Sequence, residues 1–180
     1  MLLEQRKVLE ELAGKDVVLQ VIASLPPDQR TEYESISFLS WCRHSTATEV
    51  VIRVGQSLGK LPAAFQAEVV RTGVERTFSG VWKVLLRLSS DEALIKRSAV
   101  LYSKACDRGR MTADAIAPGH VKLTLSEWPD VPDLAVIALA AGIEAVLNVV
   151  GRRSTIGWKR EQEIVVFDVR ARPSSSRPPN

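Results

Sequence analysis

The sequence holds few of the residues that carry metal or nucleophilic chemistry: two cysteines and two histidines in 180 residues. Cys42 and His44 stand in a Cys-x-His spacing, whereas Cys106 and His120 lie far along the chain. A closed zinc site takes about four such ligands, so it would need all of them, in a spacing that is not typical of zinc motifs. We therefore predict no metal site and interpret Cys106 as a small buried side chain.

Catalytic carboxylates or nucleophiles are equally hard to find. Nucleophilic catalysis needs a serine or cysteine beside an oriented base, and general acid–base catalysis needs carboxylates with shifted pKa values. Asp130 and Asp133 lie close to Glu127, but Asp133 suits a helix N-cap and the other two suit a solvated turn. The glycines are isolated and form no phosphate-binding loop. We expect no catalytic residues and no enzymatic activity.

Basic residues gather around a tryptophan near the C-terminal end, which suggests nucleic acid as one partner class. Arg152, Arg153, Lys159 and Arg160 surround Trp158, and cations beside an aromatic platform suit phosphate contact and base stacking. The glutamates that follow weaken the positive field. Charged residues on an edge strand also protect it from aggregation, so weak nucleic-acid binding through residues 152–160 is the alternative hypothesis.

Three aromatic residues are candidates for a ligand or partner surface. Trp82 and Tyr102 fall on apolar faces of predicted helices, and Trp128 ends a predicted strand beside two prolines. Large amphipathic rings of this kind form either a core or the wall of a pocket. We predict core packing first and a pocket second.

Length and composition suit a single domain with its own core. Hydrophobic residues make up 46% of the chain, enough to fold without disulfides. The net charge of +3 arises from residues 151–180, which hold seven Lys or Arg against three Asp or Glu. We expect one domain over residues 1–172, and a disordered Pro- and Ser-rich tail over 173–180.

No signal peptide or membrane segment is predicted. Charged residues interrupt the N-terminal segment where a signal peptide has its apolar core. The longest nearly apolar run, Leu134–Ile143, is far shorter than the roughly 20 residues of a bilayer span. We expect a cytoplasmic location.

The N-terminal half reads as helical. Apolar spacing over residues 2–25 predicts a helix followed by an extended or second helical piece, and two prolines then predict a loop over 26–34. The segment "SISFLSW" that follows reads as a short strand or a helix end. Thr46 and Glu49 form a capping-box signature for a helix over 47–58. From Leu61 the helical spacing continues to Leu88 with an interruption at residues 77–80, which predicts either two helices or one kinked helix that includes Trp82. A further helix is predicted from Ser89 to Gly109.

The C-terminal half changes period. Apolar residues alternate with polar ones around Pro118-Gly119, which predicts a β-hairpin. A helix over 133–150 and a second hairpin, over 155–158 and 164–169, complete a β-β-α-β-β unit. The whole is an α+β fold in which N-terminal helices pack on a four-stranded antiparallel sheet. The central helix should bury Val136, Ile137, Ala140, Ile143 and Leu147.

Several short stretches resemble an uncharacterised bacterial, myxobacterial-type paralogous family of about this length. They are Gly73, Thr77 and Phe78, then "YSKACDRG", the Pro118-Gly119 hairpin and "AAGIEAVLNVVG". The family is similar in fold to heme nitric-oxide-binding domains, 4-vinyl-reductase domains and small TRAPP subunits. The likeness covers residues 35–171 and implies a non-catalytic ligand-sensing or interaction module, for which a homodimer is conceivable.

Heme is the first cofactor to consider for such a fold, and we expect none. Heme iron needs an axial ligand in an apolar pocket, whereas His44 precedes a helix and His120 falls in a hairpin turn. Tyr102-Ser103-Lys104 does not satisfy the spaced Tyr, Ser and Arg motif of the gas sensors. The function predicted from sequence is therefore a non-enzymatic signalling module that binds an apolar small ligand or a protein partner.

Overall fold

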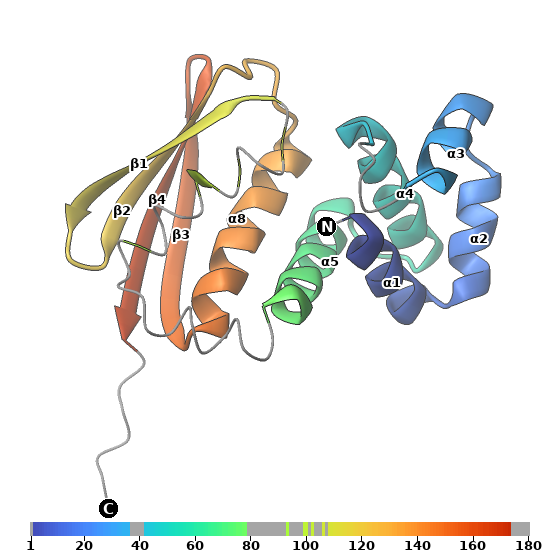
Figure 1. Ribbon diagram of the computed structural model, residues 1–180, viewed down its shortest axis with the longest axis horizontal. Helices are drawn as coiled ribbons and strands as arrows, with labels where there is room; N and C mark the ends of the chain where they lie inside the picture. The colour runs from blue at the N-terminus through green and yellow to red at the C-terminus, as the bar shows by residue number, and fades with distance from the viewer. Residues whose placement is uncertain are drawn as a thin grey trace, which may run out of the picture. The chain divides into compact units, whose positions relative to one another are not determined.

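The computed structural model describes residues 2–36, 42–78, 93, 99–100, 102, 106 and 108–173. The chain divides into two compact units, residues 1–73 and 74–180. The first is helical, and the second contains an antiparallel sheet with a helix on one face (Figure 1). The predicted α+β class is confirmed: helices come first in the chain and a four-stranded antiparallel sheet follows.

The first unit is built from short helices. Within its described residues they are α1 (Leu2–Ala13), α2 (Lys15–Ala23), α3 (Pro27–Glu34), α4 (His44–Ser57) and α5 (Pro62–Thr77), the last of which runs into the second unit. Gly14 separates α1 from α2 with φ 87°, a left-handed conformation that glycine adopts at little cost.

Helix α3 corrects the loop predicted over residues 26–34. Pro26 is the N-cap residue and Pro27 occupies the first helical turn. A proline there loses no helical hydrogen bond, because the first amides of a helix have no partner within it. Asp28 adds a carboxylate to the first turn, where the helix dipole favours negative charge. The proline pair starts a helix instead of preventing one.

Helix α4 begins three residues before the predicted start. Its N-cap residue is Arg43, so Thr46 is not the cap that the capping-box signature predicted. Thr46 is fully buried inside the first turn, and its hydroxyl donates to Glu32 Oε2 on α3 at 2.6 Å. Glu49 accepts a hydrogen bond from Arg53 one turn later at 2.6 Å. Both side chains of the signature therefore have other partners.

The core of the first unit lies between these helices. Gly55 on α4 faces Phe65 on α5, and a Cβ at position 55 would lie 2.7 Å from Phe65 Cδ1. The buried side chains that form this cluster are Val8, Leu9, Val18, Ile22, Leu25, Tyr33, Val50, Val51, Val54, Phe65 and Val69.

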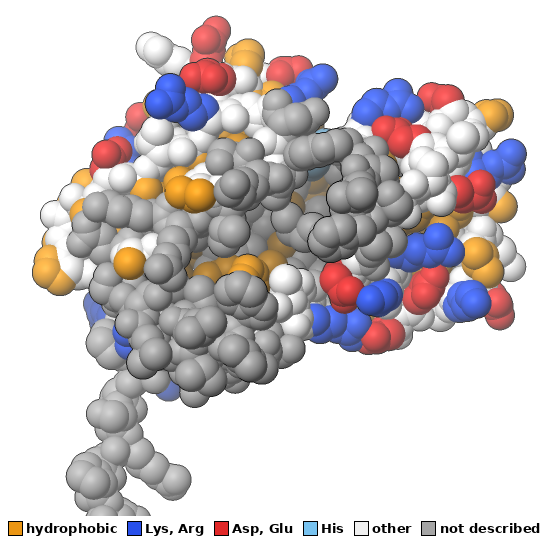
Figure 2. Space-filling model, in the orientation of Figure 1, with side chains coloured by type: hydrophobic (Ala, Val, Ile, Leu, Met, Phe, Trp, Pro, Cys, Tyr) orange, Lys and Arg blue, Asp and Glu red, His pale blue; other side chains and the backbone are white. Residues whose placement is uncertain are grey.

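The outer surface of these helices carries both signs of charge, interspersed on the face shown in Figure 2. Arg6 pairs with Glu10 at 3.0 Å within α1, and Lys60 pairs with Glu68 at 2.7 Å across the start of α5. Exposed pairs of this kind contribute about 0.2–1 kcal/mol each. They make this a solvated surface with no single dominant charge.

The sheet of the second unit is a pair of hairpins. Strands β1 (Arg110–Ala117) and β2 (His120–Ser126) form the predicted first hairpin, and β3 (Arg152–Glu161) and β4 (Ile164–Pro173) form the second, with longer strands than predicted. The strand order is β1-β2-β4-β3, so β2 and β4 are the inner strands.

The turn between β1 and β2 is held against β4. Gly119 has φ 73°, and a Cβ there would lie 2.5 Å from Ala171 O. The amide of Ala171 donates to Gly119 O at 2.7 Å. Only glycine fits this close approach, so the Pro118-Gly119 turn is part of the sheet and not a loose loop.

Helix α8 (Asp133–Val149) covers one face of the sheet, as predicted from its apolar spacing (Figure 1). Val136, Ile143 and Leu147 are buried, whereas Ile137 and Ala140 are half-buried. The sheet residues predicted to lie opposite are all buried, namely Val121, Leu123, Leu125, Val165 and Phe167.

Some predictions fall outside the described residues. These are residues 37–41 of the "SISFLSW" segment, most of the helix expected between Ser89 and Gly109, and residues 174–180 of the expected disordered tail. Trp82 lies outside them as well.

Candidate functional site

Tyr102 holds the segment before β1. Its hydroxyl donates a hydrogen bond to Arg108 O at 2.6 Å, and the side chain is 5% exposed. A Cβ at Gly109 would lie 2.9 Å from that hydroxyl, so the tyrosine packs tightly against the turn. This geometry gives Tyr102 a structural task whether or not a ligand also reaches it.

Trp128 lies in the same apolar cluster as Tyr102. It is 9% exposed and belongs to the core that Met111, Val131 and Val136 share with the sheet. Its carbonyl accepts a hydrogen bond from the amide of Val131 at 3.2 Å, which closes the turn before α8. The structure therefore places Tyr102 and Trp128 in one apolar cluster, on the face of the sheet that α8 covers.

The basic hairpin is divided by the pleat of the sheet. Trp158 pairs with Phe167 and Arg160 with Val165, which puts both on the α8 face. Arg153 and Lys159 occupy odd positions of the strand and lie on the opposite, outer face. The five residues grouped from the sequence thus form no single surface, and odd–even parity along the predicted strand is the signal that separates them.

Arg160 connects β3 to the start of α8. Its guanidinium donates to Asp133 Oδ1 at 2.7 Å and to Val131 O at 2.5 Å. Lys159 is paired with Glu161 on the outer face. Arg160 and Lys159, which were predicted to contact phosphate, therefore already have acidic partners within this unit.

His120 lies on the outer face of the sheet, beside an acid. Its Nε2 is 3.0 Å from Asp168 Oδ2, and Arg170 contacts the other oxygen of that carboxylate at 2.9 Å. The hydrogen bonds from His120 and Arg170 lower the pKa of Asp168. This contact ties the first hairpin to β4 on the face opposite α8.

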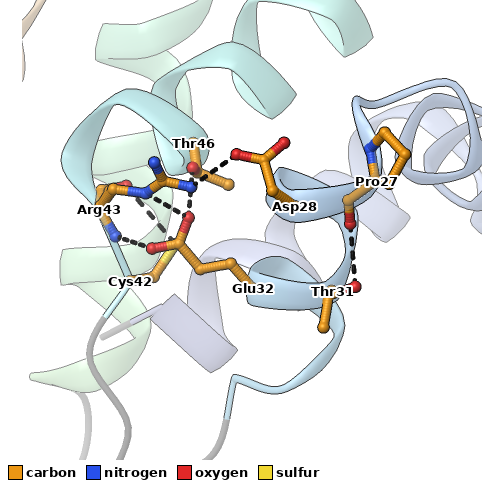
Figure 3. Close-up of polar contacts among 7 residues, drawn as sticks. All are labelled: Pro27, Asp28, Thr31, Glu32, Cys42, Arg43 and Thr46. Carbon is orange, nitrogen blue, oxygen red and sulfur yellow. Dashed lines mark hydrogen bonds and ion pairs between the residues drawn. The ribbon is translucent and has the colours of Figure 1, made fainter.

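A group of polar contacts in the first unit meets at Arg43, just before α4 (Figure 3). Its Nε donates to Glu32 Oε2 at 2.9 Å, its backbone amide donates to Glu32 Oε1 at 2.7 Å, and a second guanidinium nitrogen donates to Asp28 at 3.2 Å. Thr46 donates to the same Glu32 carboxylate. We call Asp28, Glu32, Arg43 and Thr46 the α3–α4 clasp.

The charged groups of the clasp bind one another. Burial acts to raise the pKa of Glu32, but the hydrogen bonds from Thr46 and Arg43 outweigh it and the pKa lies below its ordinary value. Beside the clasp, burial and the Glu32 carboxylate raise the pKa of Cys42 to about 11, so that thiol stays protonated at neutral pH. Sequence reasoning missed the clasp because Asp28 and Glu32 share a face only once residues 27–34 are helical.

Four types of residue in this chain could supply a ligand to heme iron. Heme takes an axial His, Cys, Met or Tyr, and the chain has two of each. His120 is engaged with Asp168 on the outer face, and His44 begins α4 at an exposed position. Partial desolvation lowers the pKa of His44.

The other ligand types fit no better. Tyr102 is engaged with Arg108, and burial raises the pKa of Tyr33 to about 12. Met111 and Cys106 pack against the sheet core, where a free cysteine behaves as a small apolar side chain. Met1 lies outside the described residues. The residues present do not fit a heme held by histidine.

The same described ranges contain neither a candidate metal cluster nor a candidate membrane span. No group of three or more His, Cys, Asp or Glu there could hold a metal ion. No described helix is long and apolar enough to cross a membrane.

No protein-family model matches the sequence, and no curated protein matches it either. Solved structures do match in fold. The Fe(II) unliganded H-NOX protein from K. algicida has a TM-score of 0.71 at 8% identity, covering 98% of this chain and 97% of that one. An oxygen-binding H-NOX domain related to soluble guanylate cyclases gives 0.64 at 17%, covering 98% and 96%.

A third match comes from a study of heme distortion in the H-NOX family, with a TM-score of 0.67 at 16% identity over 98% and 96% of the two chains. Identities this low establish the fold and not the site. The likeness to heme nitric-oxide-binding domains expected from the sequence is confirmed at the level of fold. Over nearly its whole length, this chain has the fold of H-NOX domains.

Proposed function

We propose that this chain is a non-catalytic sensory module that binds a small apolar ligand and reports its presence to a protein partner. The observation that carries the proposal is the match in fold, nearly end to end, with an oxygen-binding H-NOX domain related to soluble guanylate cyclases.

The cofactor is where the proposal departs from those neighbours. The surroundings of both histidines argue against axial ligation of an iron, because His120 contacts Asp168 and His44 lies at an exposed helix start. We infer that the module works without histidine-ligated heme. Tyr102 and Trp128 mark the apolar cluster beside which a ligand would be recognised.

The test is native mass spectrometry of the protein purified from its own host, with an absorption spectrum of the same sample. We expect a bound small mass and no Soret band. A Soret band at one heme per chain would overturn the heme-free part of the proposal, and matched His44→Ala and His120→Ala variants would then identify the ligand.

An empty, colourless sample leads to one further measurement. The melting temperature is recorded with medium-chain fatty acids, indole and benzaldehyde. A rise with one of them, absent with a charged analogue of similar size, supports the proposal. No rise with any of them contradicts it. The mass spectrum also tests whether the chain is a homodimer.

A further inference from the structure

Two arginines face each other across the second hairpin. Arg153 on β3 is the register partner of Arg172 on β4, on the outer face of the sheet, and both are exposed. Residues directly opposite in an antiparallel pair have Cβ atoms about 5 Å apart, and like charges there destabilise the sheet. This pair therefore costs the isolated hairpin some stability.

Nearby acids do not neutralise the pair. The one carboxylate close by on β4, Asp168, is already shared between Arg170 at 2.9 Å and His120 at 3.0 Å. Within the described part of the chain, neither Arg153 nor Arg172 has an acidic partner. The end of this hairpin that lies away from its turn therefore carries two positive charges, on Arg153 and Arg172, that no described acid neutralises.

Protection of a sheet edge from unwanted pairing explains only one of the two arginines. Strand β3 is an edge strand, and no described strand pairs with its outer side. Charged side chains on an edge strand discourage unwanted pairing, which explains Arg153. It does not explain Arg172, because β4 is an inner strand whose two sides are both paired.

We propose that the outer edge of β3 binds an extended acidic segment of a partner protein, which adds as a further strand and places carboxylates beside Arg153 and Arg172. Backbone hydrogen bonds would supply affinity, and alternate side chains would supply specificity. Gly157 lies on the same face of β3 as Arg153, four residues further along the strand. A Cβ at this position would have no atom within 4 Å, so the side chains of an added strand would have room there.

The same geometry favours a peptide over a nucleic acid. Base stacking needs an aromatic platform near the cations, and Trp158 lies on the opposite face of the strand, paired with Phe167. In an extended peptide, carboxylates at every second residue all lie on one face, so they can face the arginines together.

Fluorescence anisotropy with a labelled peptide, Glu-Val-Glu-Thr-Glu-Val-Glu, tests the proposal on the full chain. We expect saturable binding that an Arg153→Glu, Arg172→Glu double variant weakens about tenfold or more, as expected when charge-assisted contacts reverse sign. Arg110→Glu, an exposed arginine on the same face at the opposite edge strand, should leave the affinity within about twofold.

The single variant Arg153→Glu separates recognition from loss of fold. It places opposite charges across from each other, so the melting temperature should rise or hold while peptide binding weakens. A drop in both would mean that the arginine acts only through the fold, and the proposal would fail.

Strand addition is tested with the same peptide N-methylated at alternate residues, which keeps the carboxylates but removes backbone donors. Equal binding by the methylated peptide would overturn the added strand. Tighter binding of oligo-dT or of phosphatidylserine vesicles through the same two arginines would overturn the choice of partner.

Discussion

Tyr102 and Tyr33 are both withdrawn from solvent, but they differ in what their hydroxyls contact. The Tyr102 hydroxyl donates to Arg108 O at 2.6 Å. The Tyr33 hydroxyl is buried within the first unit, where no described group bonds to it. A buried polar group without a partner weakens the fold, whereas a paired one contributes modestly to it.

The two tyrosines make a matched pair of variants. Tyr102→Phe should lower the free energy of unfolding by about 1 kcal/mol, because a buried hydrogen bond is lost. Tyr33→Phe should leave it unchanged or raise it slightly. Urea denaturation of both variants measures the difference. A large loss on Tyr33→Phe would show that its hydroxyl has a partner after all, such as a bound ligand.

Because of Glu32, the free energy of unfolding should depend on pH in the acid range. Its pKa in the folded chain lies below its ordinary value of 4.5, so the unfolded chain binds its proton more tightly. The contribution of the α3–α4 clasp is therefore complete above about pH 4.5 and is lost as the pH falls through the lower, folded-state pKa. The contribution of Glu32 to stability should therefore be lost at acid pH and not at alkaline pH.

A Glu32→Gln variant checks this dependence. It should cost about 1–2 kcal/mol at neutral pH, because Arg43 and Thr46 lose a charged acceptor. The cost should shrink as the pH falls through the lowered pKa of Glu32, because the wild-type carboxylate then becomes protonated as well. Asp28→Asn, which changes a more exposed acid of the same clasp, is the control with little effect. An equal cost at neutral and at acid pH would contradict the assignment.

At the scale of elements, the packing of the Phe65 side chain of α5 against α4 depends on Gly55. A methyl group there would lie 2.7 Å from Phe65 Cδ1, inside a cluster where Phe65 is fully buried. Gly55→Ala should therefore destabilise the chain by about 1–3 kcal/mol through overpacking.

Gly73→Ala is the matched control, since it lies in α5 with nothing within 4 Å of its Cβ position. It should stabilise by roughly 0.5–1 kcal/mol, the usual gain of alanine over glycine in a helix. Thermal denaturation of both variants gives the two signs. The same sign for both would show that α4 and α5 do not meet as described.

Helix α8 offers the largest expected effect. Ile143 is 7% exposed and lies in the cluster between α8 and the sheet, so Ile143→Asp should cost several kcal/mol by stranding a charge in the core. Ile116→Asp, at a 56% exposed position on β1, should cost little. An unchanged melting temperature for Ile143→Asp would contradict the placement of α8.

The elements differ in how well the sequence predicts them, for physical reasons. The hairpins follow from strict alternation around Pro118-Gly119, and α8 from its apolar spacing, because both patterns are local. Helix α3 was missed because a proline pair can either end or begin a helix, and only the contacts of Glu32 with Arg43 and Thr46 show which.

At the scale of the whole molecule, the fold is recognisable although the identities to its structural neighbours are only 8% to 17%. Patterns of buried and exposed residues survive such divergence, while individual site residues do not. The proposed departure from heme depends on single residues, His44 and His120, and their contacts could not be deduced from spacing alone. Fold was therefore accessible from the sequence, and the ligand was not.

The strand order β1-β2-β4-β3 has a consequence for how the second unit folds. Each hairpin is formed by strands that are neighbours in the sequence. The pairing of β2 with β4, by contrast, joins strands that α8 and β3 separate in the sequence, so residues such as Leu123 and Phe167 meet only after a long loop closes. Closing a long loop is slow, because its entropy is lost before the contacts form. Leu123→Ala should therefore slow refolding in stopped-flow fluorescence, whereas Ile156→Ala, within the second hairpin, should mainly speed unfolding. Docking of the two hairpins would then set the rate at which this unit reaches its native state.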